Sequence, residues 1–101
     1  MVRFLVLYDT PQDVEAFDRH YREVHIPLAR KLPGLRRYTV SRAPSAIRGG
    51  EPYYLIAELD WDDIAALQRA FQSPEGKQTA DDVSKLAASG VRSMVFELED
   101  V

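Results

Sequence analysis

The sequence of 101 residues contains no cysteine, and this absence removes several kinds of site at once. Without thiols the chain has no disulfide bond, no thiolate metal site and no cysteine nucleophile. Long apolar runs are also missing, since no stretch approaches the roughly 20 apolar residues of a membrane-spanning helix. The opening run, residues 1–8, is too short for a secretory signal, and Asp9 follows it in place of a small-residue cleavage site. These absences predict a cytoplasmic protein without a membrane segment.

An excess of basic charge is missing as well. The 13 lysines and arginines are outnumbered by 16 acidic residues, which gives a formal net charge of -3. Nucleic-acid-binding domains usually carry a basic footprint, so nucleic acid is not an expected partner. The sequence also contains no phosphate-cradling glycine loop, no serine nucleophile elbow and no pair of catalytic carboxylates. Any chemistry must therefore depend on histidine and tyrosine side chains in an apolar pocket.

What the chain does have is the composition of one globular domain, spanning residues 1–101. Apolar and alternating runs predict four strands, at about residues 3–8, 35–42, 53–59 and 92–98. Apolar residues three and four apart predict a long helix over about 11–32 and shorter ones over about 64–71 and 80–87. Thr10 and Asp60 are the expected caps of the first two helices. The order β-α-β-β-α-β indicates an α+β protein with a ferredoxin-like antiparallel sheet and helices on one face.

The second face of such a sheet has no helices to cover it, and its composition is apolar. Depending on register, the residues on this open face include Leu5, Leu7, Ile56, Val95 or their alternates. An apolar face of several hundred square ångströms seldom stays in contact with water. We therefore expect a homodimer formed through the sheet face, with two-fold symmetry.

Both histidines fall on the first predicted helix. His25 lies at the edge of the apolar stripe, near Tyr21, and should point toward the sheet, whereas His20 lies on the opposite edge and should be more exposed. Pro27 removes one helical hydrogen bond and should cause a kink or a bulge, a disruption that is frequent near functional sites. His25 is therefore a candidate general acid or base. The alternative is a histidine that only bridges helix and sheet through one hydrogen bond.

Other polar residues give weaker signals. His20 and His25 are five apart, about 140° around an ideal helix, whereas a helical two-histidine site prefers a spacing of four, so no metal site is expected. The five tyrosines are either donors in a cavity between helix and sheet or ordinary packing residues. The basic residues of the second strand are either a carboxylate-binding patch or a solvated strand edge; they are Arg36, Arg37 and Arg42.

Two segments of the sequence resemble the EthD family. Residues 17–35 contain a phenylalanine, an aromatic, the pattern His-x-Pro-Leu beginning at His25, and a Leu-Pro-Gly-Leu junction into the second strand. Residues 71–76, followed by Asp81 and Asp82, are similar to the second characteristic patch of the family. The resemblance covers nearly the whole chain. It implies a dimeric α/β barrel, in which two ferredoxin-like subunits pack sheet against sheet.

The resemblance also implies a range of functions. Relatives in the wider superfamily include cofactor-free monooxygenases, muconolactone isomerases, and polyketide cyclases and decarboxylases. We therefore expect a cofactor-independent enzyme of one of these types, acting on a small apolar or aromatic oxygenated metabolite. His25 and Tyr21 are the expected catalytic residues, and the expected substrate-binding residues are Tyr38, Tyr54 and Phe71. The alternatives are a non-catalytic small-molecule-binding or accessory protein, and a purely structural dimer module.

Overall fold

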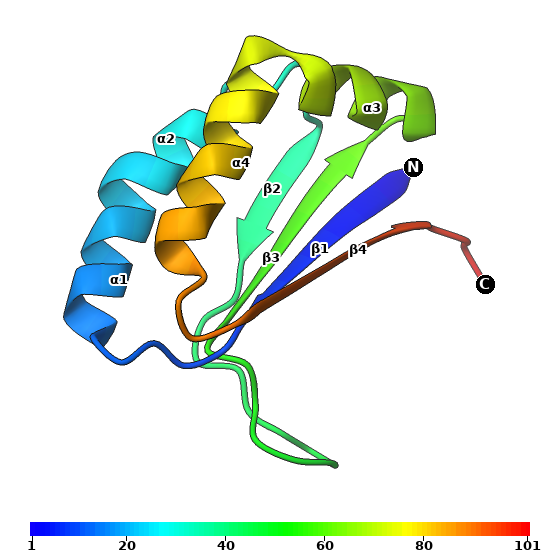
Figure 1. Ribbon diagram of the computed structural model, residues 1–101. Coiled ribbons are helices and arrows are strands. Elements are labelled where there is room, and N and C mark those ends of the chain that lie inside the picture. The colour runs from blue at the N-terminus through cyan, green and yellow to red at the C-terminus, as the bar shows by residue number, and fades with distance from the viewer.

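The computed structural model describes residues 1–101 and has the predicted ferredoxin-like architecture, with helices layered on one face of a sheet (Figure 1). The antiparallel sheet has the order β2-β3-β1-β4, and its strands are β1 (Val2–Tyr8), β2 (Arg37–Val40), β3 (Leu55–Trp61) and β4 (Val91–Glu97). The helices are α1 (Val14–His20), the π-helical η1 (Tyr21–His25), α2 (Ile26–Ala29), α3 (Ile64–Gln72) and α4 (Pro74–Leu86). None of these helices has the length and hydropathy that a membrane crossing requires.

The first helix begins later than predicted. Its first residue is Val14 and its N-cap is Asp13, whose carboxylate accepts the Ala16 N–H at 3.0 Å. Thr10 was therefore the wrong cap. Aspartate at the N-cap satisfies one unpaired donor of the first turn and also interacts favourably with the helix dipole.

The second predicted cap is wrong as well, because β3 extends two residues further than expected. The last residue of β3 is Trp61, which is fully buried in the core. Its indole N–H donates to the Pro33 carbonyl at 2.9 Å. Asp60 is consequently part of the strand, where Arg3 donates two hydrogen bonds to its carboxylate at 2.9 and 3.1 Å. Asp63 caps α3 instead and accepts the Ala66 N–H at 2.8 Å.

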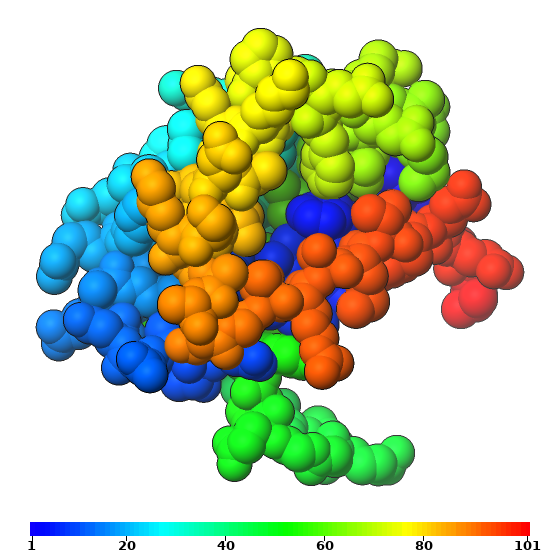
Figure 2. Space-filling view, viewed as in Figure 1, coloured from blue at the N-terminus to red at the C-terminus, as the bar shows by residue number.

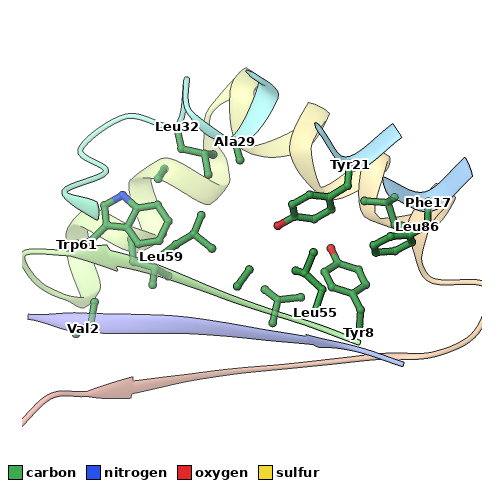
Figure 3. Close-up of a cluster of buried hydrophobic side chains, with 14 residues drawn as sticks. Val2, Tyr8, Phe17, Tyr21, Ala29, Leu32, Leu55, Leu59, Trp61 and Leu86 are labelled. Atoms are coloured by element: carbon green, nitrogen blue, oxygen red, sulfur yellow. The ribbon is translucent and has the colours of Figure 1, made fainter. Parts of the chain in front are cut away.

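Strand register decides which side chains face the helices. The buried β1 residues Val2, Val6 and Tyr8 alternate along the strand and join the core under the helix layer (Figure 3). Leu5 and Leu7 point to the opposite, open face, where they pair with Met94 and Ile56. Val95 pairs with Phe4, which packs against the core, so Val95 belongs to the helix side and Met94 and Phe96 take its place on the open face.

The corner between α3 and α4 is tight. Ser73 ends one helix and caps the next, accepting the Gly76 N–H at 3.0 Å through its hydroxyl oxygen. A Cβ atom on Gly76 would collide with the carbonyl oxygens of Ala70 and Phe71. Backbone atoms cannot move aside cheaply, so only glycine permits this approach of the two helices.

We expect Gly76→Ala to lower the free energy of unfolding by about 1–3 kcal/mol, the usual range for overpacking. Urea denaturation followed by circular dichroism measures the change. Gly50→Ala is the matched control, since a Cβ atom there meets nothing within 4 Å and the residue has no positive φ. Equal unfolding midpoints for the two variants would contradict this account of the corner.

Candidate functional site

A cavity of about 290 Å³ lies between the helix layer and the sheet. Twelve of the 16 residues that line it are hydrophobic, and the lining comes from all four strands, from η1, α2, α3 and α4, and from Leu32. Figure 2 shows the hollow between α4 (yellow to orange) and β4 (orange-red), with part of β1 (blue) visible at its floor. An apolar concave site with a few polar groups is the usual form of a small-molecule binding site.

His25 supplies one of these polar groups. It is 5% exposed, it lines the cavity, and its Nδ1 lies 2.9 Å from Oδ2 of Asp82 on α4. Asp82 is also buried, at 4% exposure. Its other oxygen, Oδ1, lies 2.8 Å from Nε2 of His20. One buried carboxylate therefore bonds both histidines of the chain.

The π-helix η1 explains how two histidines five residues apart reach the same carboxylate. In η1 the N–H of Ile26 bonds to the carbonyl of Tyr21, an i→i+5 hydrogen bond that adds one residue to the turn. Our separation of about 140° assumed an ideal α-helix and is therefore wrong for this segment. The predicted irregularity near Pro27 is confirmed. Because Pro27 lacks an N–H group, it cannot make the ordinary bond to residue 23.

The bond to Asp82 fixes the tautomer of His25. An ionised carboxylate only accepts hydrogen bonds, so Nδ1 carries the proton that it donates to Asp82. The lone pair of the neutral ring is then on Nε2, which has no protein partner. The one buried side-chain nitrogen or oxygen atom without a partner is Oε2 of Glu75, so Nε2 of His25 must be accessible from the cavity. Nε2 is positioned to accept a proton from a bound molecule.

Burial and hydrogen bonding shift the pKa values of His25 and Asp82. Burial lowers the pKa of His25 below its ordinary value of 6.5, and this effect outweighs the bond to Asp82, which acts in the opposite direction. Burial raises the pKa of the Asp82 carboxyl, but the hydrogen bonds from His20 and His25 outweigh it, and the net pKa is below the ordinary value. The resulting state is a neutral imidazole beside an ionised carboxylate.

Three tyrosines line the same cavity. The hydroxyls of Tyr21 and Tyr38 are 2.7 Å apart, so one donates to the other and one O–H remains to serve a ligand. Tyr8, the third of them, is 1% exposed. In Figure 3 the hydroxyls of Tyr8 and Tyr21 both point into the space between the helices and the sheet. Burial raises the pKa of each of these phenols, which keeps them protonated as donors.

The structure brings together four of the five residues that we expected at the site: His25, Tyr21, Tyr38 and Phe71 line the cavity. It places Tyr54 elsewhere. The hydroxyl of Tyr54 donates to Asp18 at 2.7 Å, and its ring packs edge-on against Phe17. Burial and the bond to Asp18 raise the pKa of Tyr54 to about 12.

Tyr8, His20 and Asp82 are further polar residues of the site. Tyr8 could have been found from strand parity, because it alternates with the apolar residues Val2 and Val6. Asp82 comes one turn before Leu86, a residue of the apolar stripe, and a carboxylate on a buried helix face is an informative signal.

The basic residues of the second strand lie outside the cavity. Arg36 forms an exposed ion pair with Asp62 at 2.9 Å, Arg37 is exposed, and Arg42 lines a separate polar hollow beside the 41–54 loop. The chain contains no group of three or more His, Cys, Asp or Glu side chains placed to hold a metal ion.

Comparisons with known proteins find a family model and relatives that match most or all of the chain. The model of the EthD domain matches residues 9–90. An uncharacterized 11.0 kDa protein of the thcB-thcC intergenic region of Rhodococcus erythropolis is 34% identical over 101 residues, which cover 100% of this chain and 98% of the relative. The crystal structure of the EthD family protein bh0200 from Bacillus halodurans is 39% identical, with a TM-score of 0.90 and coverage of 98% and 99%.

More distant solved structures share the fold. SnoaB of Streptomyces nogalater, a cofactor-independent oxygenase, is 20% identical with a TM-score of 0.66 over 99% of this chain and 94% of its own. Ferredoxin-like proteins described as dimeric, from Bacteroides fragilis and Thermobifida fusca, are 16% and 18% identical. The match to the domain model and the two relatives above 30% identity lead to one conclusion: the chain belongs to the EthD family.

Proposed function

We propose that the protein is a cofactor-independent enzyme that removes a proton from a small apolar or aromatic oxygenated metabolite. Cyclase, isomerase and cofactor-free monooxygenase reactions of such compounds depend on this step, whereas in a decarboxylase the same imidazole would return a proton to the carbanion left after loss of CO2. The observation that carries the proposal is that Nε2 of His25 and the tyrosine hydroxyls open into one apolar cavity. A cofactor-independent oxygenase with the same fold supports the reaction class.

His25 is the general base of the proposed reaction. Its Nε2 takes a proton from a carbon or hydroxyl of the substrate, and the positive charge that develops on the ring is stabilised by Asp82 behind it. The electron pair left on the substrate delocalises onto an adjacent oxygen as an enolate or phenolate. A positioned base of this kind typically contributes about 10²–10⁴-fold to a rate.

The tyrosines provide donors for that oxygen. Tyr21 is the expected catalytic donor, and its hydroxyl is polarised by the 2.7 Å bond to Tyr38. Fixed donors in a cavity that excludes water stabilise developing negative charge more strongly than water does. The apolar walls, which include Phe71, contact the hydrocarbon part of the substrate.

We propose further that the protein is a homodimer formed through the open sheet face. The face presents Leu5, Leu7 and Ile56, half-buried, together with Met94 and Phe96, which are 45% and 39% exposed. Across the strands Leu5 lies opposite Met94 and Leu7 opposite Ile56, and the charged residues Arg3, Glu58 and Arg92 border this apolar group. Two solved structures of this fold are described as dimeric, which supports a homodimer.

The base can be tested without knowing the natural substrate. 5-Nitrobenzisoxazole is a planar aromatic carbon acid: loss of its C3 proton to a base breaks the N–O bond and releases a coloured phenolate. We expect the protein to accelerate this reaction, His25→Ala to lower kcat/KM by about 10²-fold or more, and Tyr21→Phe to lower it less. Tyr53→Phe, which removes a hydroxyl outside the cavity, is the matched control. Binding of the probe without turnover, unaffected by His25→Ala, would favour a binding or accessory protein instead.

The pH dependence gives a second test. The base works only when Nε2 is unprotonated, so the rate should fall as pH drops through the pKa of His25. Because burial lowers this pKa below 6.5, half of the maximal rate should still be present at a pH below 6.5. Initial rates between about pH 4.5 and 8 give the midpoint. A midpoint above 6.5 would contradict a desolvated His25 as the base.

The dimer is tested by light scattering at micromolar concentration. Wild type should have twice the chain mass of 11.5 kDa. Introducing charge into the apolar face by Met94→Glu together with Phe96→Glu on β4 should produce a folded monomer, since a charge buried in an interface without a partner is costly. Ile47→Glu, at a loop position that is 94% exposed, should remain dimeric. A monomeric wild type would disprove the proposal.

A further inference from the structure

The buried carboxylate of Asp82 serves two histidines that differ sharply in their access to solvent. The side chain of His25 is 7% exposed and lines the cavity, whereas that of His20 is 29% exposed. They bond to different oxygens of the carboxylate, at 2.9 and 2.8 Å. His20 itself does not line the cavity, so it reaches the site only through Asp82.

We propose that Asp82 and His20 are positioning residues for His25: Asp82 holds it as the Nδ1–H tautomer with Nε2 free, and His20 adjusts how strongly Nε2 holds a proton. This inference rests on the proposed role of His25 as a base, and it adds the two residues that prepare that base. Neither of them touches the substrate cavity.

The geometric part of the proposal follows from the satisfaction of buried polar atoms. A carboxylate oxygen without a donor in this environment costs roughly 1–3 kcal/mol. His25 satisfies Oδ2 and His20 satisfies Oδ1, so both oxygens are held and the carboxylate cannot rotate away from His25. Neither oxygen is left as an unpaired buried atom. His20 thereby keeps the carboxylate plane, and through it the ring of His25, in one orientation.

The electrostatic part of the proposal follows because the two histidines share the single negative charge of Asp82. Asp82 favours the protonated ring of His25, whereas a positive charge on His20 opposes it. The other titratable groups that face His25 are Tyr21 on η1, Tyr38 on β2 and Tyr8 on β1, and all three are neutral phenols. A positive charge on His20 compensates Asp82 and so weakens His25 as a proton acceptor.

The proposal can be tested by NMR on the full chain without any substrate. The protein has only two histidines, so ¹⁵N-histidine labelling gives two imidazole spin systems. Multiple-bond ¹H–¹⁵N spectra report the tautomer of each ring, and a pH series reports its titration. In wild type we expect His25 as the Nδ1–H tautomer at neutral pH. An Nε2–H tautomer would overturn the proposal.

Two variants separate positioning from charge. His20→Gln keeps an N–H donor for Asp82 and removes the titratable group, so the tautomer of His25 should persist while its pKa rises. Asp82→Asn removes the shared charge, so the pKa of His25 should fall and its tautomer preference should weaken. Asp81→Asn, an exposed neighbour on α4, is the control for net charge. A His25 titration that is the same in His20→Gln as in wild type overturns the tuning role, whether or not Asp82→Asn folds.

Failure of the positioning proposal and failure of the proposed enzymatic function give different results. The NMR experiment concerns the state of His25, and the benzisoxazole reaction concerns its use. Expected spectra with no acceleration would disprove the enzymatic function and leave the positioning of His25 intact. Acceleration of the benzisoxazole reaction, together with a His25 titration that His20→Gln leaves unchanged, would disprove the tuning role of His20 and leave the enzymatic function intact. In an active protein, His20→Gln should move the midpoint of the pH–rate profile upward, a shift that a purely structural role would not produce.

Discussion

The candidate site depends on one buried negative charge. Asp82 lies on α4, at 4% exposure, and an isolated carboxylate in such surroundings would be strongly destabilising. Its two histidine partners come from the first helical segment, 57 and 62 positions earlier in the chain. The requirement to pair this charge therefore fixes the distance and rotation of α4 relative to α1 and η1. Removal of either partner leaves an oxygen of a buried charge without a donor, a strongly unfavourable arrangement.

Two irregular features of the backbone shape the region around Asp82. The extra residue in the turn of η1 aims His20 and His25 at one carboxylate, and Gly76 lets α4 begin directly against the end of α3. Between these fixed points the helices and the sheet leave a cavity with apolar walls. Its polar groups are neutral phenols, a neutral imidazole and the hydroxyls of Thr79 and Ser93, which such a cavity tolerates without the desolvation cost of a charge.

Much of the fold could be predicted because it follows from short-range periodicity. Four strands and the helix order come from apolar patterns, and His25 and Tyr21 come from their place on one helical stripe. The site was harder to predict where it depends on long-range contacts or non-ideal geometry. The link between His25 and Asp82 joins residues far apart in the sequence, and the separation of the histidines was misjudged because ideal α-helical geometry does not hold in η1. Tyr54 precedes the first residue of β3, so strand parity could not place it.

The two faces of the sheet carry different features. The cavity lies on the helix side and its hollow runs beside the edge strand β4, whereas the apolar face proposed for dimerisation lies on the reverse of the sheet (Figures 1 and 2). Subunits joined back to back through that reverse face would leave each cavity with its own entrance, directed away from the symmetry axis. Small molecules would then enter the cavity of one subunit independently of the other subunit. Dimer formation would contribute to stability without restricting access to either cavity.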